Sequence, residues 1–483
     1  MAQPIASRPI KSRSPLFAAV PGGAFSRSGL ALPREFGQLY PAYCLLGFVI
    51  IEFACQMGLL SDIVAKARVF IRIMAFAGSL ALLLILRRPG DSHPSSKAAS
   101  LALLVVGLSV FHPDTVSAWA GLATLLLYAS ILGPIFWVPR VRIDVRTLRQ
   151  LFMLFWAYHA LSALFGALQI YFPGHFQPAL SSVYDDDSYI ESVKIQLVDG
   201  TRVFRPMGLT DTPGGAASSG AYTVILGLAF LLDKPRRWLR LVLLVSMALG
   251  LFSLYLSQVR SMLVMLGISV VSLGIPFLLQ KRMQRFFSLV LIVAGIAALG
   301  FVLAVSVGGN LVTDRLSTLT ESDPGSVYYA NRGLFLEYTF ADVVPSYPLG
   351  TGLGRWGMIS RYFGDRLGSA PPLWAEIAWT GWAYDGGALL MLFYVIALLI
   401  ALRTALRVAT AYDGADPSPL QNWGTVLFGY SVGVFATTFN GQPFVGTTGV
   451  DFWVLNAAAF AAYRQSRNTT PQFVEGPTRL ASE

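Results

Sequence analysis

Arginines in polar segments are the residues of this sequence best suited to chemistry. A guanidinium group stays charged at any physiological pH and can bind a phosphate through two parallel hydrogen bonds. Such groups could hold a phosphorylated ligand, or they could simply extend their charges from a membrane surface into water. The arginines considered are, in chain order, Arg202, Arg205, Arg260, Arg315, Arg332 and Arg355.

Arg260 has the most unusual position of these residues. It occupies a tight turn between two apolar segments, 239–256 and 261–280. A charge at a membrane boundary is costly unless it is paired or hydrated, so such a residue is a functional candidate by default. The alternative is a side chain that only reaches toward the interface.

A run of alternating glycines lies in the same polar segment as Arg355. It comprises Gly350, Gly352 and Gly354. Because glycine has no Cβ, this backbone could approach a ligand closely and bind substrate, or it could form a simple turn. No strand-to-helix unit with a later acidic residue frames the run, so it is not a dinucleotide-binding fingerprint.

Two sets of acidic residues are further candidates, one in a loop and one in an apolar segment. The run Asp185–Asp187 could hold a divalent cation beside a diphosphate, but a solvated loop tip is the favoured interpretation, and no metal site is predicted. Glu376 and Asp385 are polar positions at the start of the apolar segment 376–402 and could face a cavity.

The elements that must position these residues are membrane helices. The chain of 483 residues is 54% hydrophobic and 13% charged, whereas a soluble protein has about 25% charged residues. An apolar run of about 20 residues spans a bilayer. We therefore predict an all-α polytopic membrane protein with about 12 transmembrane helices, at 39–60, 67–87, 98–112, 115–138, 151–172, 216–232, 239–256, 261–280, 286–307, 376–402, 423–440 and 446–463.

The basic residues predict the orientation of these segments. With the N-terminus inside, the inner stretches hold 24 Lys and Arg and the outer stretches hold 11, of which 8 lie in the long loops 173–218 and 308–375. This bias follows the positive-inside rule. It also accounts for the net positive charge, so no nucleic-acid partner is expected. The membrane domain is predicted to be 39–463, between a disordered cytoplasmic tail, 1–38, and a second cytoplasmic tail, 464–483.

Three motifs together resemble the O-antigen polymerase and ligase superfamily. The Ser-x-x-Arg-Ser turn at 257–261 opens an apolar helix, and Arg332 precedes the Pro-x-Gly-x-Gly-x-Gly block at 348–354. The segment 205–213 is similar to the Arg-x-x-Gly-x-x-x-x-Pro stretch that leads into the next helix. The chain departs from the family's pattern after that proline, where it has Gly214 in place of the usual asparagine.

The resemblance implies a GT-C-like glycosyltransferase of the bacterial inner membrane, with both termini cytoplasmic and the long loops periplasmic. Such enzymes take an oligosaccharide from undecaprenyl diphosphate without a metal or other cofactor. Polymerases extend exopolysaccharide, capsule or O-antigen. A flippase and a chain-length regulator are the possible protein partners that this resemblance implies. Ligases instead transfer the glycan to lipid A-core. The second long loop, 308–375, lacks the histidine that ligases share, which favours a polymerase.

The resemblance also implies roles for individual residues. Positive charge stabilises a departing diphosphate, and the acceptor hydroxyl needs a base. A secondary transporter is the alternative from another class, although the chain shows no related halves. The expected catalytic residues are Arg205, Arg260, Arg332, Glu337 and Asp211, and the expected substrate-binding residues are Arg202, Arg315, Arg355, Gly350, Gly352 and Gly354.

Overall fold

The computed structural model describes the greater part of residues 40–469. Its described residues are 40–61, 67–86, 92–178, 190–191, 193–197, 200–317, 323–364, 372–411 and 418–469. The predicted N-terminal tail, the Asp185–Asp187 run and residues 470–483 lie outside these ranges.

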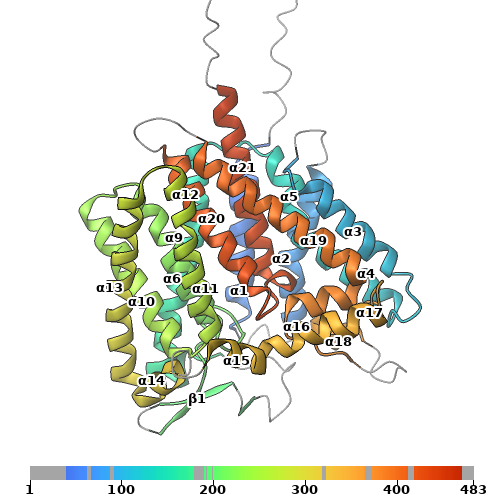
Figure 1. Ribbon diagram of the computed structural model, residues 1–483, viewed down its shortest axis with the longest axis horizontal. Coiled ribbons are helices and arrows are strands. Elements are labelled where there is room, and N and C mark those ends of the chain that lie inside the picture. The colour runs from blue at the N-terminus through green and yellow to red at the C-terminus, as the bar shows by residue number, and fades with distance from the viewer. Residues whose placement is uncertain are drawn as a thin grey trace, which may run out of the picture. The chain divides into compact units, whose positions relative to one another are not determined.

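The described part is almost entirely helical (Figure 1). Its first half contains α1 (Tyr43–Gly58), α2 (Arg68–Ile85), α3 (Ser96–Ser109), α4 (Ala118–Leu132), α5 (Pro134–Trp137), η3 (Val138–Arg140), α6 (Val145–Tyr171), α7 (Pro173–Phe176), β1 (Lys194–Gln196), β2 (Arg202–Phe204), α9 (Gly215–Leu232) and α10 (Arg237–Leu256). Its second half contains α11 (Arg260–Ser272), α12 (Gly274–Leu279), α13 (Met283–Gly308), α14 (Asn310–Ser317), α15 (Pro324–Tyr328), η4 (Tyr329–Gly333), α16 (Leu334–Tyr338), η5 (Thr339–Val343), α17 (Val344–Ser346), α18 (Gly357–Phe363), α19 (Ala378–Thr410), α20 (Pro419–Thr437), η6 (Pro443–Val445) and α21 (Thr447–Thr469).

The prediction of an all-α, multi-pass membrane protein is confirmed. Every one of the twelve predicted segments contains a helix or a pair of consecutive helices. Within the described ranges, seven helices are long and apolar enough to cross a membrane, or eight if the bent pair 118–140 is one span. α1 and α3 are shorter, with 16 and 14 residues, so the full count of twelve spans remains a prediction.

The helices divide into an interior group and a peripheral group. In α9, 83% of the apolar stretch is buried inside the protein, whereas the corresponding share is 11% in α13 and 17% in α2. Small residues let the interior helices approach closely, as is typical within a bilayer. A Cβ on Gly250 of α10 would lie 2.8 Å from the carbonyl oxygen of Gly220 in α9.

The described parts of both long loops lie at one end of the helical bundle. Figure 1 shows β1, α14, α15 and α18 together at the lower end of the view. Two of the stretches predicted to be inner, 139–150 and 464–483, contact each other away from these loops. Gln465 donates to the Val141 carbonyl over 3.0 Å, and Arg464 donates to the Pro139 carbonyl over 3.2 Å. We refer to the end that carries the loops as the loop end.

The two loops differ in their secondary structure. The first contains an antiparallel pair of short strands, β1 and β2, with Lys194 opposite Phe204. The helical prediction did not anticipate this hairpin. In the second loop, helical residues run without a gap from Pro324 to Ser346 and include the π segments η4 and η5. This confirms the helix predicted over 331–343.

Candidate functional site

The packing of α11 against α20 determines which residues share the loop end. A Cβ on Gly429 would lie 3.1 Å from Leu273 Cγ, and a Cβ on Gly433 would lie 3.2 Å from the carbonyl oxygen of Met265. Residue numbers therefore rise along α20 as they fall along α11, so the two helices are antiparallel. Glycine at both positions lets the helix backbones approach closely.

Extending this register places Arg260 at the loop end of α11. Gly433 of α20 faces both Ser269 and Met265, so it lies opposite the turn of α11 around residue 267. α20 ends beyond this point at Thr437, and Asn440 follows it in a turn, while in the opposite direction α11 begins at Arg260. These two residues therefore lie at the same end of the α11–α20 pair.

Arg332, in the second loop, is hydrogen-bonded to Asn440 at this same end of the bundle. Its Nε donates to the Asn440 carbonyl over 3.2 Å, and its Nη1 lies 2.7 Å from Glu376 Oε2. The Arg332 side chain is 37% exposed and that of Glu376 is 23% exposed, so water and ligands can reach the pair. Arg332 and Arg260, which are 72 positions apart in the sequence, thus share one end of the bundle.

The segment 205–214 also meets the Arg260 turn. A Cβ on Gly214 would lie 3.2 Å from Cγ2 of Val259, the residue directly before Arg260. Gln169 in α6 holds the middle of the segment: its Oε1 accepts from the amides of Met207 and Gly208 over 2.8 and 2.9 Å. The half-buried Arg205 stands at the start of this anchored segment.

Asp211 has a different environment from the one expected of a general base. Its carboxylate is 4% exposed and accepts a hydrogen bond from the guanidinium of Arg72 in α2. The sequence did not link Asp211 with Arg72, because the two residues are 139 positions apart. The pair anchors the 205–214 segment to α2, and an ion-paired carboxylate is a poor acceptor for a substrate proton.

Arg202 is occupied by an ion pair within the strand hairpin region. Its Nη1 lies 3.1 Å from Glu191 Oε2, and Lys194 Nζ lies 2.5 Å from Glu191 Oε1. The hydrogen bond from Lys194 holds the pKa of the Glu191 carboxyl below its usual range. Arg202 is 66% exposed, so a ligand phosphate could replace Glu191 at modest cost.

The glycine run is packed against the protein itself. Gly350, Gly352 and Gly354 have φ of +100°, +87° and +79°, values that residues other than glycine rarely adopt. A Cβ on Gly350 would lie 2.8 Å from the Tyr384 carbonyl, and one on Gly352 would lie 2.6 Å from the Thr115 amide. This packing explains the glycines without a ligand, and their substrate-binding role remains a prediction.

The run docks where α19 is interrupted. Gly386 and Gly387 have non-helical dihedral angles, and the loop bonds to the freed backbone: the Thr351 amide donates to the Tyr384 carbonyl over 2.8 Å. The predicted segment 376–402 had no such break. Asp385 at the break is 3% exposed and accepts from Tyr128 and Trp356 over 2.8 and 2.9 Å. It therefore holds the loop in place rather than facing an open cavity.

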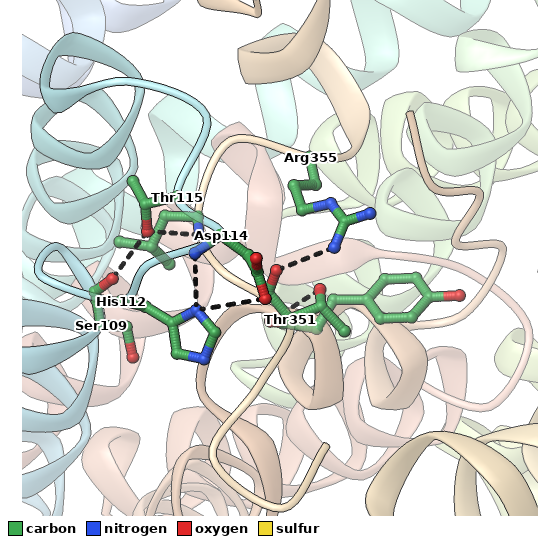
Figure 2. Close-up of polar contacts among 8 residues, drawn as sticks. Ser109, His112, Asp114, Thr115, Thr351 and Arg355 are labelled. Carbon is green, nitrogen blue, oxygen red and sulfur yellow. Dashed lines mark hydrogen bonds and ion pairs between the residues drawn. The ribbon is translucent and has the colours of Figure 1, made fainter. Parts of the chain in front are cut away.

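The fold brings His112 to the glycine run, which sequence reasoning missed. Figure 2 shows His112, Asp114 and Arg355 around the Thr351 segment. His112 Nδ1 lies 3.9 Å from Asp114 Oδ2 and accepts from the Asp114 amide over 3.2 Å. The Val116 amide donates to the Leu353 carbonyl over 3.1 Å. No sequence signal could have found this pairing, because about 240 residues separate the two segments.

The remaining predicted residues are less closely connected. Arg355 donates to the Thr351 carbonyl over 3.1 Å. Glu337 is exposed and accepts a hydrogen bond from the Tyr329 hydroxyl, which holds the Glu337 carboxylate over the helical stretch 324–346. Arg315 lies in α14, at the loop end.

The described residues contain no group of three or more His, Cys, Asp or Glu side chains that could hold a metal ion. The helices define the class of the molecule as a multi-pass membrane protein whose arginine-bearing loops gather at one end. No family model matches the sequence, and comparison with curated proteins finds no relative.

Proposed function

We propose that the protein is a polymerase of lipid-linked glycans, which transfers oligosaccharide repeat units from undecaprenyl diphosphate to the end of another lipid-linked unit. The observation that carries this proposal is the gathering of Arg260, Arg332 and the Arg205 segment at the loop end. Guanidinium groups positioned there suit a substrate whose lipid lies in the bilayer and whose diphosphate lies at its surface.

The chemistry requires charge stabilisation and one proton acceptor. The acceptor hydroxyl attacks the anomeric carbon, and the bond from that carbon to the diphosphate oxygen breaks. The diphosphate leaves with the electron pair, while the hydroxyl proton passes to a base. Arginines next to the departing oxygen stabilise the charge that develops there. Glu337 and His112 are the reachable candidates for the base, since the Asp211 carboxylate is occupied by Arg72.

A ligase is the second candidate, and His112 is the observation that favours it. The absence of histidine from 308–375 favoured a polymerase at the level of sequence. The fold supplies a histidine to that same loop from the connection between α3 and α4. The transporter alternative has weaker support, because the arginines gather at one end of the bundle rather than around its middle.

Deletion of the gene should separate polymerase from ligase. For a polymerase, we expect single repeat units to accumulate on the lipid carrier and long chains to disappear, because no other step would join the units into chains. Separating lipid-linked and surface glycans by length in deleted and complemented strains measures this. If long chains persist on the carrier and only their attachment to lipid A-core is lost, the ligase assignment is correct.

The proposed location is the bacterial inner membrane, with twelve spans, cytoplasmic termini and the loop end facing the periplasm. Reporter fusions at Asp323, in the second loop, should then report the outside, and fusions at Arg146 the inside, because the basic residues are concentrated in the inner stretches. A cytoplasmic signal from Asp323 would reject this orientation.

A further inference from the structure

The interior of the bundle holds two acidic side chains that the proposed site does not use. Glu52 lies near the middle of α1 and Asp451 lies in the second turn of α21; they are 1% and 6% exposed. The two carboxyl groups interact electrostatically. Within the part of the chain that the structure describes, neither oxygen of Glu52 and not Oδ1 of Asp451 has a hydrogen-bond partner.

The groups around this acidic pair are neutral and protic. Tyr158 and Tyr430 interact electrostatically with both carboxyl groups, and Tyr222 interacts with Asp451. Arg72 of α2, the helix that packs against α1, is paired with Asp211. The titratable groups facing the acidic pair, from four helices, are Cys55 of α1, Tyr158 and His159 of α6, Tyr222 of α9 and Tyr430 of α20.

Two ionised carboxylates in this environment would repel each other without hydration or a neighbouring cation. A charge at the centre of a membrane protein is expensive, and like charges that share a site cannot both remain ionised. A metal cation such as Ca²⁺ requires six to eight oxygen ligands, whereas two carboxyl groups are the only acidic groups here among the described residues. A proton neutralises one carboxyl group and also supplies a donor to an oxygen that lacks one.

We propose that Glu52 and Asp451 form an intramembrane proton-binding site, in which the two carboxyl groups hold one exchangeable proton. Tyr158 connects this site to the 205–214 segment. Its ring stacks on Phe53, the residue after Glu52, with centroids 4.0 Å apart, and its hydroxyl donates to the Leu209 carbonyl over 3.2 Å. The proposal does not depend on glycan transfer.

Infrared difference spectroscopy of the full-length protein in liposomes tests the site. We expect a pH-dependent carbonyl stretch from a protonated carboxyl group, which shifts when aspartate and glutamate are labelled with carbon-13. Glu52→Gln and Asp451→Asn should each remove or displace this band while the protein stays helical and monodisperse. Asp314→Asn, a change at an exposed carboxylate in α14, is the matched control and should leave the band unchanged.

Two results would overturn the proposal. The first is a wild-type spectrum without such a band, or one that Glu52→Gln and Asp451→Asn both leave intact. The second is loss of the wild-type band when Na⁺, K⁺ or Ca²⁺ is added at constant pH, since the site would then bind a metal cation. The wild-type measurements need no substitution, so a variant that fails to fold does not prevent the test.

Discussion

Arg332→Ala is expected to lower glycan transfer by about 10²- to 10³-fold, the usual effect of removing one group that stabilises developing negative charge. The protein should still insert and accumulate, because the side chain is 37% exposed and supports no buried core. Arg205→Ala and Arg260→Ala should have similar effects. Lysine at each position should restore only part of the activity, since a point charge cannot reproduce the planar pair of donors.

Two further variants distinguish a chemical role of Arg332 from a structural one. Glu376→Gln breaks the ion pair but keeps the arginine, so transfer should exceed that of Arg332→Ala by at least about tenfold. Equal losses in both variants would mean that Arg332 only anchors the loop. Arg237→Ala removes an exposed arginine at the start of α10 and is the matched control. Polymer length and yield from membranes with equal amounts of protein provide the measurement.

Asp211→Ala is expected to destabilise the protein by about 3–5 kcal/mol, because it leaves the Arg72 guanidinium without its buried partner. The loss should appear as a lower unfolding temperature in detergent and as reduced accumulation in membranes. Arg72→Gln alone should have a comparable effect. The double variant Arg72→Gln/Asp211→Asn removes both charges and should recover most of the stability.

The double variant also tests whether Asp211 is the general base. If the ion pair is structural, Arg72→Gln/Asp211→Asn should regain activity together with stability. A variant that is as stable as the wild type but inactive would restore Asp211 to the catalytic role that its sequence position suggested. Glu337→Gln and His112→Gln would then be expected to retain activity.

The sequence alone determined the class of fold and the approximate positions of the long apolar helices. Runs of apolar residues long enough to cross a bilayer must be helical, because a lipid-exposed backbone can only satisfy its hydrogen bonds internally. The same local information located the turn at Arg260 and the helix over 331–343. The β1–β2 hairpin and the break at Gly386–Gly387 were not predicted, because tertiary contacts rather than local propensity stabilise them.

Only the tertiary structure decided which polar groups lie next to one another. Arg72 with Asp211, His112 beside the glycine run, and Glu52 with Asp451 each bring together residues that lie far apart in the sequence. Hydropathy describes one segment at a time and carries no information about which faces of two helices meet. In a bilayer that choice depends on close packing of small residues and on pairing of polar groups. A carboxylate that the sequence suggested as a base is therefore found paired with an arginine of α2, and two acidic side chains that the sequence left unnoticed lie together in the core.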